Sequence, residues 1–220
     1  MLESSFVSHV AGYVKKQIEL GFPDNLNYSE QIFVKITSGA LFKLRKCFQH
    51  INSPYYQGPF QDKFNPYNGD HWTMFLYLCS RESFLTLNDE ILSSKFFLLN
   101  KMRHSVDIFY KVELPEVFVF GHPLGTVLGN AKYGNFLCVY QGCTVGSKKG
   151  IFEYAEFGEN TTLYSNSTVI GKCKIGNNVT FGANSSIIDT TISDNTTVLG
   201  FYPHQRLVNN QGIKEDVFLY

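Results

Sequence analysis

Apolar residues recur at every sixth position from Val127 to Ile187, in eleven consecutive positions without a gap. The residues between them are mostly Gly, Asn, Thr and Ser. An α-helix repeats every 3.6 residues and a β-strand every two, so neither accounts for a strict period of six. A coil with three flat faces, each six residues long, does account for it. The pattern therefore predicts a triangular solenoid whose successive turns stack on one another.

Glycine directly follows the apolar position in several of these repeats. The positions are Gly134, Gly146, Gly158, Gly176 and Gly182. Glycine and asparagine tolerate a positive φ, which β-branched residues resist. We therefore expect these glycines to form the corners of the coil with positive φ. The spacing does not fix the hand of the coil, and the general rule for crossover connections predicts a right-handed one.

A change in composition near residue 106 divides the chain. Before it, Phe, Leu, Tyr and Lys occur at helical spacing, and the predicted helices span 3–20, 29–50, 70–85 and 89–103. After it, β-branched residues, Gly and Asn predominate. We expect an α+β chain: an N-terminal α-helical domain over residues 1–105, the solenoid over 106–201, and a tail over 202–220 that packs back on it.

Charge and cysteine usage exclude several classes of function. Lys plus Arg and Asp plus Glu each number 19, without a basic run, so nucleic acid and anionic membranes are poor candidate partners. No apolar stretch is long enough to cross a bilayer, so stable membrane insertion is not expected. The five cysteines contain no CxxC pair. We interpret them as buried thiols of a protein in the reducing cytoplasm.

One histidine stands where the repeat begins, in the segment Gly121-His-Pro-Leu-Gly-Thr-Val-Leu-Gly129. Imidazole titrates near neutral pH and can take a proton from a hydroxyl, so His122 is a candidate general base. The alternative, a surface histidine without chemistry, stays open on this observation alone. A zinc enzyme would need about three converging histidines. Only His122 and His204 follow residue 106, so no metal is expected.

Two motifs and their spacing resemble those of the serine acetyltransferases, which are hexapeptide-repeat acyltransferases. Asp107-Ile108 precedes His122 by fifteen residues, and Gln141-Gly-Cys-Thr-Val-Gly146 follows. The resemblance covers about residues 65–208. It implies a left-handed parallel β-helix, acetyl-CoA as acyl donor, and a homotrimer with active sites between subunits. It also implies that His122 is the general base and that Asp107 orients it and stabilises its charged form.

Two departures argue against serine as the acceptor. Serine acetyltransferases carry Asp immediately before the catalytic His, where this chain has Gly121. They also carry an Arg-His pair after the second motif, and the corresponding segment 147–153 has neither residue. A desolvated zwitterion needs charged partners at both ends. The chain more closely resembles the serine-acetyltransferase-like O-acetyltransferases of bacterial surface-polysaccharide synthesis, which share the His-Pro-Leu-Gly-Thr-Val-Leu-Gly signature.

A Gly-Asp segment that leads into a helix with Phe-Leu-Tyr-Leu is also shared with those enzymes. Here Asp70 and His71 are candidates to hydrogen-bond sugar hydroxyls, and Trp72 to stack on a pyranose. An equally open alternative makes Asp70 the N-cap of the helix and Trp72 a core residue. Gln141 is a further candidate acceptor contact. By position, the resemblance implies a coenzyme groove lined by Gly146, Lys148, Ala183, Ser185, Gly200 and Arg206.

Together these features predict an acetyl-CoA-dependent O-acetyltransferase. It would transfer acetyl to a hydroxyl of a sugar or glycan precursor of capsule, lipopolysaccharide or exopolysaccharide, by direct attack and without a metal. Two alternatives stay open: a serine acetyltransferase with altered acceptor recognition, and a non-catalytic β-helix scaffold.

Overall fold

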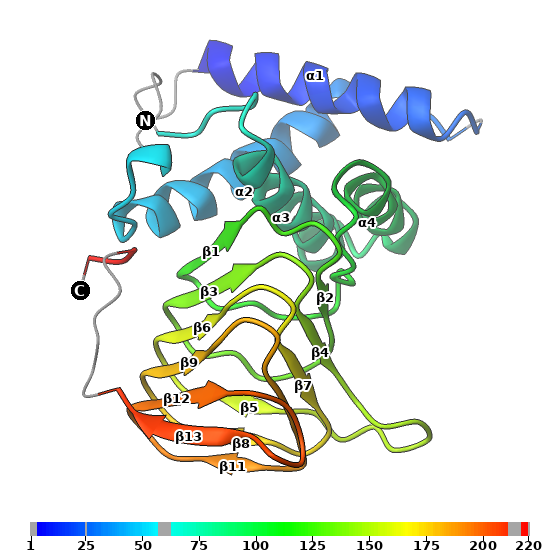
Figure 1. Cartoon of the computed structure of the whole chain (residues 1–220). Coiled ribbons are helices and arrows are strands. Elements are labelled where there is room, and N and C mark those ends of the chain that lie inside the picture. Colours follow the sequence, from blue (N-terminus) through cyan, green and yellow to red (C-terminus); the bar gives the residue numbers. More distant parts are fainter. Residues whose placement is uncertain (1–3, 25, 57–62, 211–216, 220) are drawn as a thin grey trace.

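The computed structural model describes residues 4–24, 26–56, 63–210 and 217–219 (Figure 1). Its N-terminal part is helical, with α1 Ser4–Gly21, α2 Glu30–Gln49, the short 3-10 helix η1 Pro54–Tyr56, α3 Gly69–Leu87 and α4 Glu90–His104. The four predicted α-helices are confirmed, with ends displaced by two residues or fewer. None of the helices in the described ranges is both long and apolar enough to cross a membrane.

Helix α3 lies at the centre of the helical layer, and residues 71–80 are all buried. It begins at Asn68, whose side-chain Oδ1 accepts the backbone N–H groups of Asp70 at 2.9 Å and His71 at 3.2 Å. Asn68 is therefore the N-cap, and the alternative that gave this role to Asp70 is wrong. Because Asn68, two residues earlier, caps the helix, the Asp70 carboxylate is left to make other contacts.

The C-terminal part is a solenoid of short strands (Figure 1). The strands are β1 Phe118–Gly121, β2 Val127–Leu128, β3 Leu137–Tyr140, β4 Thr144–Gly146, β5 Glu156–Phe157, β6 Thr161–Leu163, β7 Thr168–Ile170, β8 Lys174–Ile175, β9 Val179–Phe181, β10 Ser186–Ile188, β11 Thr191–Ile192, β12 Thr196–Leu199 and β13 Arg206–Asn209. They form three sheets, with strand orders β1-β3-β6-β9-β12-β13, β2-β4-β7-β10 and β5-β8-β11. All neighbours are parallel except β12 and β13.

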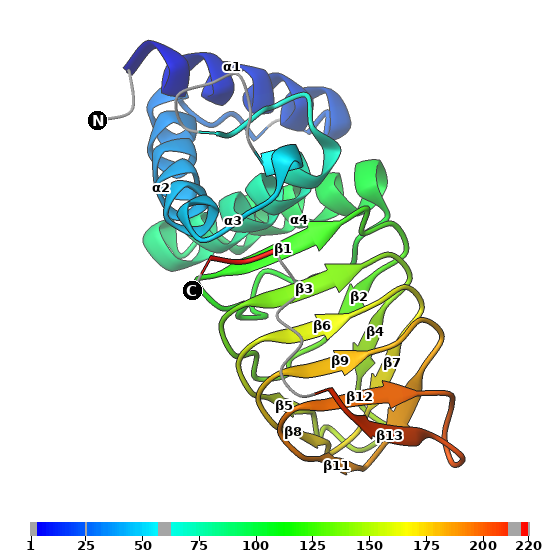
Figure 2. The same ribbon diagram turned by 60° about the vertical axis from the view of Figure 1, so that its left-hand side comes forward.

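The coil is left-handed, as the resemblance implies. In Figure 1 the parallel strands β1, β3, β6, β9 and β12 run from left to right across the front, and the chain returns behind them as it descends. The expectation from the crossover rule is therefore wrong for this fold. The helical layer covers the β1 end of the coil in both views (Figure 2).

Two of the eleven apolar repeat positions do not point into the coil. Val127 is 39% exposed because its neighbour Leu128 pairs with Val145 and fills the inward position. Ile151 is 45% exposed and lies in the connection from β4 to β5. That connection, residues 147–155, has nine residues where the next turn has three, residues 171–173. The insertion is one repeat long, so the period of six runs through a loop without interruption.

The corners of the coil differ from the expectation. Positive φ occurs mainly at asparagines and at other glycines, among them Asn160, Asn166, Asn178, Asn184, Asn195, Gly142, Gly171 and Gly200. None of the five glycines that follow an apolar repeat position has a positive φ. Gly134 and Gly158 instead allow close backbone approach: a Cβ on Gly134 would lie 2.5 Å from the Gly158 carbonyl. At these two positions glycine is needed because neighbouring turns of the coil approach closely, and not because the backbone adopts a positive φ.

The end of the chain returns to the helical layer. Strand β13 pairs antiparallel with β12. Further on, the carbonyl of Val217 accepts the backbone N–H of Asn52 at 2.8 Å, and the buried Phe218 forms a bridge with Ile51. Figure 2 shows this last segment beside β1. All five cysteines are free and buried, as expected.

Candidate functional site

A cavity of about 490 Å³ opens where the helical layer meets the first turn of the coil. Its described lining comes from η1, the start of α3, β1, β3 and the C-terminal segment. The residues are Ser53, Tyr55, Tyr56, Asn68, Gly69, Asp70, Val119, Phe120, Gly121, His122, Cys138, Tyr140 and Val217. The candidate base His122 and the candidate acceptor ligand Asp70 therefore share one cavity.

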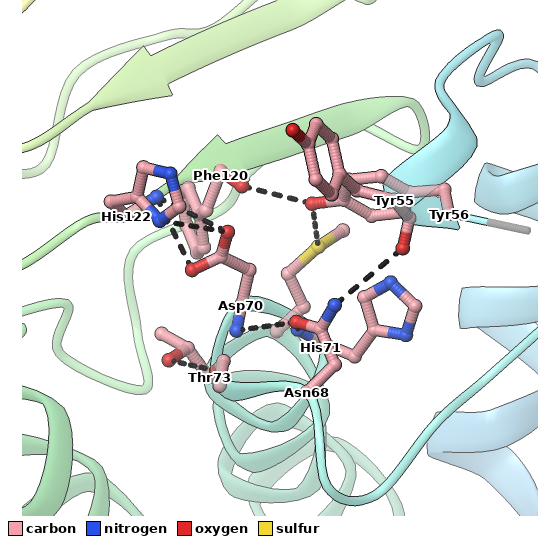
Figure 3. A network of polar contacts seen from close by, with 10 residues as sticks. Tyr55, Tyr56, Asn68, Asp70, His71, Thr73, Phe120 and His122 are labelled. Atoms are coloured by element: carbon pink, nitrogen blue, oxygen red, sulfur yellow. Dashed lines mark hydrogen bonds and ion pairs between the residues drawn. The ribbon is translucent and has the colours of Figure 1, made fainter. Parts of the chain in front are cut away.

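His122 and Asp70 point toward each other across the mouth of this cavity (Figure 3). The backbone N–H of His122 donates to both carboxylate oxygens of Asp70, each at 3.2 Å. The imidazole Nδ1 lies 3.7 Å from Asp70 Oδ2, and the His122 side chain is 85% exposed. His122 has a φ of 51°, in the left-handed region, and this turns its side chain out of the strand β1 that precedes it. The imidazole is thus open to a ligand while a carboxylate faces its Nδ1.

The Asp70 carboxylate is mostly buried, with 21% of its side chain exposed. Burial raises its pKa above the ordinary aspartate value, and the N–H and charge of His122 oppose that rise only in part. A carboxylate held this way is a strong hydrogen-bond acceptor in a poorly hydrated place. It can bind a hydroxyl or stabilise an imidazolium.

Replacing Asp70 with asparagine is expected to stabilise the fold at neutral pH. A carboxyl whose pKa is raised by folding favours the folded state below its unfolded pKa, and this contribution is lost as pH rises through the folded pKa. Asp70→Asn removes that cost and keeps one acceptor for the His122 N–H. The melting temperature near pH 7 should rise by about 1–3 °C, and the gain should shrink as the pH falls and disappear below the unfolded aspartate pKa of about 4. A lower melting temperature at pH 7 would contradict this interpretation of Asp70.

Asp107, the predicted partner of His122, is placed differently. Its carboxylate Oδ2 lies 2.6 Å from Nζ of Lys101, at the end of α4. Its backbone N–H donates to the carbonyl of Thr126 at 2.9 Å, which holds it beside the start of the second sheet. No hydrogen bond or ion pair joins Asp107 to His122 in the part of the chain that the structure describes. The carboxylate that the structure brings to His122 is that of Asp70, and the role of Asp107 stays a prediction.

Two of the predicted acceptor residues lie in the core. Trp72 is only 4% exposed and packs on Phe75, with ring centroids 4.8 Å apart. His71 is fully buried, its Nδ1 accepts the backbone N–H of Asn65, and burial lowers its pKa to about 4. The hypothesis that Trp72 stacks on a sugar and His71 binds one is wrong, because both side chains point into the helical layer. Of the three residues, only Asp70 lines the cavity.

The aromatic lining of the cavity was missed by sequence reasoning. Tyr55 is 79% exposed, while Tyr56 is buried and donates its hydroxyl hydrogen bond to the carbonyl of Phe120 at 2.9 Å. Tyr140, at the end of β3, pairs in register with Gly121. The sequence signal for Tyr140 is its place directly before Gln141, the start of the second motif. The residue type gave no sign of a site, because tyrosines are frequent along this chain.

A continuous edge joins the first sheet to the second and begins at His122. We call it the His122 edge; it consists of residues 122–126, 141–143, 165–167, 183–185 and 200–205. Its turns are linked by backbone hydrogen bonds, for example from Gly142 N to the carbonyl of Leu124 and from Asn184 N to that of Ser165, each at 2.9 Å. Asparagine side chains also stack along it, with Asn166 Nδ2 3.2 Å from Asn184 Oδ1.

The predicted coenzyme residues are distributed over two edges of the second sheet. Gln141, Ala183 and Gly200 are exposed on the His122 edge, and Arg206 follows it on β13. Ser185 lies on the same edge but is fully buried with its side chain inside the coil, so its prediction as a groove residue is wrong.

Gly146 and Lys148 lie at the other end of β4, where Lys148 forms an ion pair with Asp189. Both residues therefore belong to the second sheet or follow it directly, but they lie on the side of that sheet opposite the His122 edge. A single groove along one edge therefore does not include all six predicted positions.

Comparisons with known proteins agree with this architecture. The profile of the family described as "Bacterial transferase hexapeptide (six repeats)" matches residues 154–189. A comparison with curated protein sequences finds no match. Serine acetyltransferase structures, in contrast, superpose on almost the whole chain. The enzyme of Neisseria gonorrhoeae in complex with serine has a TM-score of 0.70 at 20% sequence identity, covering 94% of this chain and 84% of its own.

The chain has the fold of the serine acetyltransferases. The third isoform from Entamoeba histolytica, in complex with cysteine, has a TM-score of 0.62 at 22% identity and covers 90% of this chain and 71% of its own. A serine acetyltransferase in complex with CoA has a TM-score of 0.58 at 16% identity, covering 88% and 73%. The predicted order of a helical part followed by a left-handed β-helix is thus confirmed. At such identities the likeness concerns the fold and leaves the acceptor open.

Proposed function

We propose that the protein is an acetyl-CoA-dependent O-acetyltransferase that acetylates a hydroxyl of a sugar or glycan precursor of a bacterial surface polysaccharide. The observation that carries the proposal is the exposed imidazole of His122 at the mouth of a cavity, with the Asp70 carboxylate 3.7 Å from its Nδ1. His122 lies between a cavity that is large enough for an acceptor and the His122 edge, along which a second substrate can lie. This position suits a base that promotes transfer of a group between two substrates.

The proposed reaction is a direct attack. His122 takes the proton from the acceptor hydroxyl, and that oxygen attacks the thioester carbonyl of acetyl-CoA. Backbone N–H groups stabilise the oxyanion that forms. The thiolate of CoA then leaves and takes the proton from His122, giving the acetyl ester and free CoA. The carboxylate of Asp70 stabilises the imidazolium between these two steps.

We place acetyl-CoA along the His122 edge, with its thioester at His122. The exposed backbone at Gln141, Ala183 and Gly200 suits the amide-rich pantetheine arm, and Arg206 suits a phosphate group. The resemblance also implies a homotrimer in which a neighbouring subunit completes this groove. Asp107 belongs to the same proposal: it would support His122 if Lys101 released it when substrates bind.

L-Serine is the less favoured acceptor. No lysine or arginine is among the described residues that line the cavity, so a substrate carboxylate would find no permanently charged cationic partner there. The experiment that tests the proposal is acetyl-CoA turnover, followed by release of free thiol, with methyl pyranosides compared with L-serine. We expect turnover with at least one pyranoside and none above background with serine. Turnover with serine alone would favour the alternative enzyme, and failure to bind acetyl-CoA in calorimetry would favour a scaffold.

A further inference from the structure

Side chains of the helical layer cover the free edge of strand β1. Because β1 lies at the end of its sheet, alternate residues direct their backbone N–H and C=O groups toward the helices and away from β3. At Phe118 both groups meet Sγ of Cys47, at 3.4 Å from the nitrogen and 3.0 Å from the oxygen. At Phe120 the carbonyl accepts a hydrogen bond from the Tyr56 hydroxyl, with 2.9 Å between the oxygens. The helical layer thus supplies bonds that a further strand would make.

The same edge ends at the candidate base. His122 is the next residue in this alternation, and its backbone N–H donates to the two carboxylate oxygens of Asp70, each at 3.2 Å. Gly121 lies between His122 and Phe120, and glycine has more backbone freedom than any other residue type. Tyr56 holds the peptide group on one side of Gly121, and Asp70 holds the peptide group on the other (Figure 3). The direction in which the His122 side chain leaves the strand therefore depends on both contacts.

Tyr56 is itself held in place by packing. Its side chain is 5% exposed, and its ring packs on Phe48 and on His71, with ring centroids 5.0 and 4.6 Å apart. Burial raises the pKa of Tyr56 well above the ordinary tyrosine value, so the hydroxyl keeps its proton and stays a donor. Burial also lowers the pKa of His71 to about 4, so the imidazole beside Tyr56 is uncharged near neutral pH. The Tyr56 hydroxyl is therefore a fixed donor that points at one backbone carbonyl.

We infer that Tyr56 is a positioning residue for the reacting imidazole: its hydrogen bond to the Phe120 carbonyl holds the end of β1 so that His122 faces Asp70 at the mouth of the cavity. The inference rests on the proposed function for the reaction that it serves, although the contact it describes is independent of turnover. Loss of the hydroxyl leaves the buried Phe120 carbonyl without this partner, and the chain before Gly121 gains freedom to move. A displacement of about 1 Å at a catalytic group can cost about 100-fold in rate.

The first test is Tyr56→Phe, which removes the hydroxyl and keeps the ring packed on Phe48 and His71. We expect kcat for acetyl transfer to fall about tenfold or more, because the imidazole is no longer held in the productive position. KM for acetyl-CoA should stay within about twofold of the wild type, because the backbone along the His122 edge is unchanged. Steady-state thiol release with the best methyl pyranoside gives both constants. A kcat within about twofold of the wild type would overturn the inference.

Tyr77→Phe is the matched control. Tyr77 is also a buried tyrosine whose hydroxyl donates to a backbone carbonyl, that of Val112 at 3.0 Å, and it accepts the N–H of Leu114 at 2.9 Å. It lies outside the described lining of the cavity. This variant should lower the melting temperature at least as much as Tyr56→Phe, because two backbone groups lose a partner, and it should leave kcat within about twofold. If Tyr77→Phe lowers kcat as much as Tyr56→Phe does, the effect follows overall stability and the inference is wrong.

Hydrogen exchange separates this inference from the proposed function. The exchange rate of the His122 amide, measured by NMR without substrates, reports how often its bond to Asp70 opens. That rate should rise about tenfold in Tyr56→Phe and stay within about twofold in Tyr77→Phe. If this pattern holds while the wild type transfers no acetyl group, the proposed function fails and the role of Tyr56 in holding His122 stands. If acetyl is transferred but the His122 amide exchanges equally fast in the wild type and in Tyr56→Phe, or equally fast in both variants, the inference fails and the function stands.

Discussion

Replacing His122 with asparagine is expected to lower kcat for acetyl transfer by about 10²–10⁴-fold, the usual contribution of a general base. Asparagine is the appropriate replacement because residue 122 has a φ of 51°, which asparagine tolerates better than alanine. The side chain is 85% exposed and makes few contacts, so the melting temperature should stay within about 1–2 °C of the wild type.

His9→Asn is the matched control. His9 is also exposed, and it lies on α1, outside the lining of the cavity and outside the His122 edge. This variant should retain full turnover at saturating acetyl-CoA. The kcat of His122→Asn and that of the control are measured from steady-state thiol release, and the product is confirmed by mass spectrometry. If His122→Asn retains wild-type kcat while remaining folded, direct base catalysis by His122 is excluded.

Replacing Gly158 with alanine is expected to destabilise the coil by about 3 kcal/mol, or about 6–12 °C in melting temperature. A Cβ at this position would lie 2.7 Å from the carbonyl carbon and oxygen of Gly176 on the next turn, and 2.6 Å from Asn177 Oδ1. The obstacle is backbone, so the turns must separate to admit a methyl group. Parallel strands hold their neighbours at about 4.8 Å, which leaves little freedom.

Gly146→Ala is the control for this effect. Gly146 holds the same place in its repeat, directly after an apolar position, but the nearest atom to its Cβ would be Cδ1 of Ile170 at 3.4 Å. That side chain can turn aside, so the change should cost less than about 0.5 kcal/mol. Thermal unfolding, monitored by circular dichroism, compares the loss of stability in Gly158→Ala with that in Gly146→Ala. Equal losses would show that glycine matters at these positions for another reason.

The repeat was readable because its cause is local. Each apolar residue of the coil packs against the one above it, so a period in the sequence becomes a column in the structure, as in Val145, Val169 and Ile187. The same period made the insertion that contains Ile151 impossible to recognise from the sequence. An inserted segment of one repeat length leaves the period intact, and only the pairing of strands reveals that those residues leave the coil.

The site was only partly readable, because its other half comes from the helical layer. His122 was found from its place at the start of the repeat. Its neighbour Asp70 lies 52 residues earlier, and their contact depends on how α3 packs on β1. The order of residues at the start of α3 did not reveal that Asn68 takes the cap and that Trp72 turns inward. Tyr140 lines the cavity because β3 pairs in register with β1, and the sequence does not show this pairing.

The most direct test of the central claim is transfer of a labelled acetyl group. The wild-type protein is incubated with ¹³C-labelled acetyl-CoA and an equimolar mixture of methyl pyranosides and L-serine, and the products are identified by mass spectrometry. The account predicts one labelled acetyl ester on a pyranoside hydroxyl, its loss in His122→Asn, and no O-acetylserine above background. Labelled O-acetylserine as the main product, or a pyranoside ester that persists in His122→Asn, would contradict it.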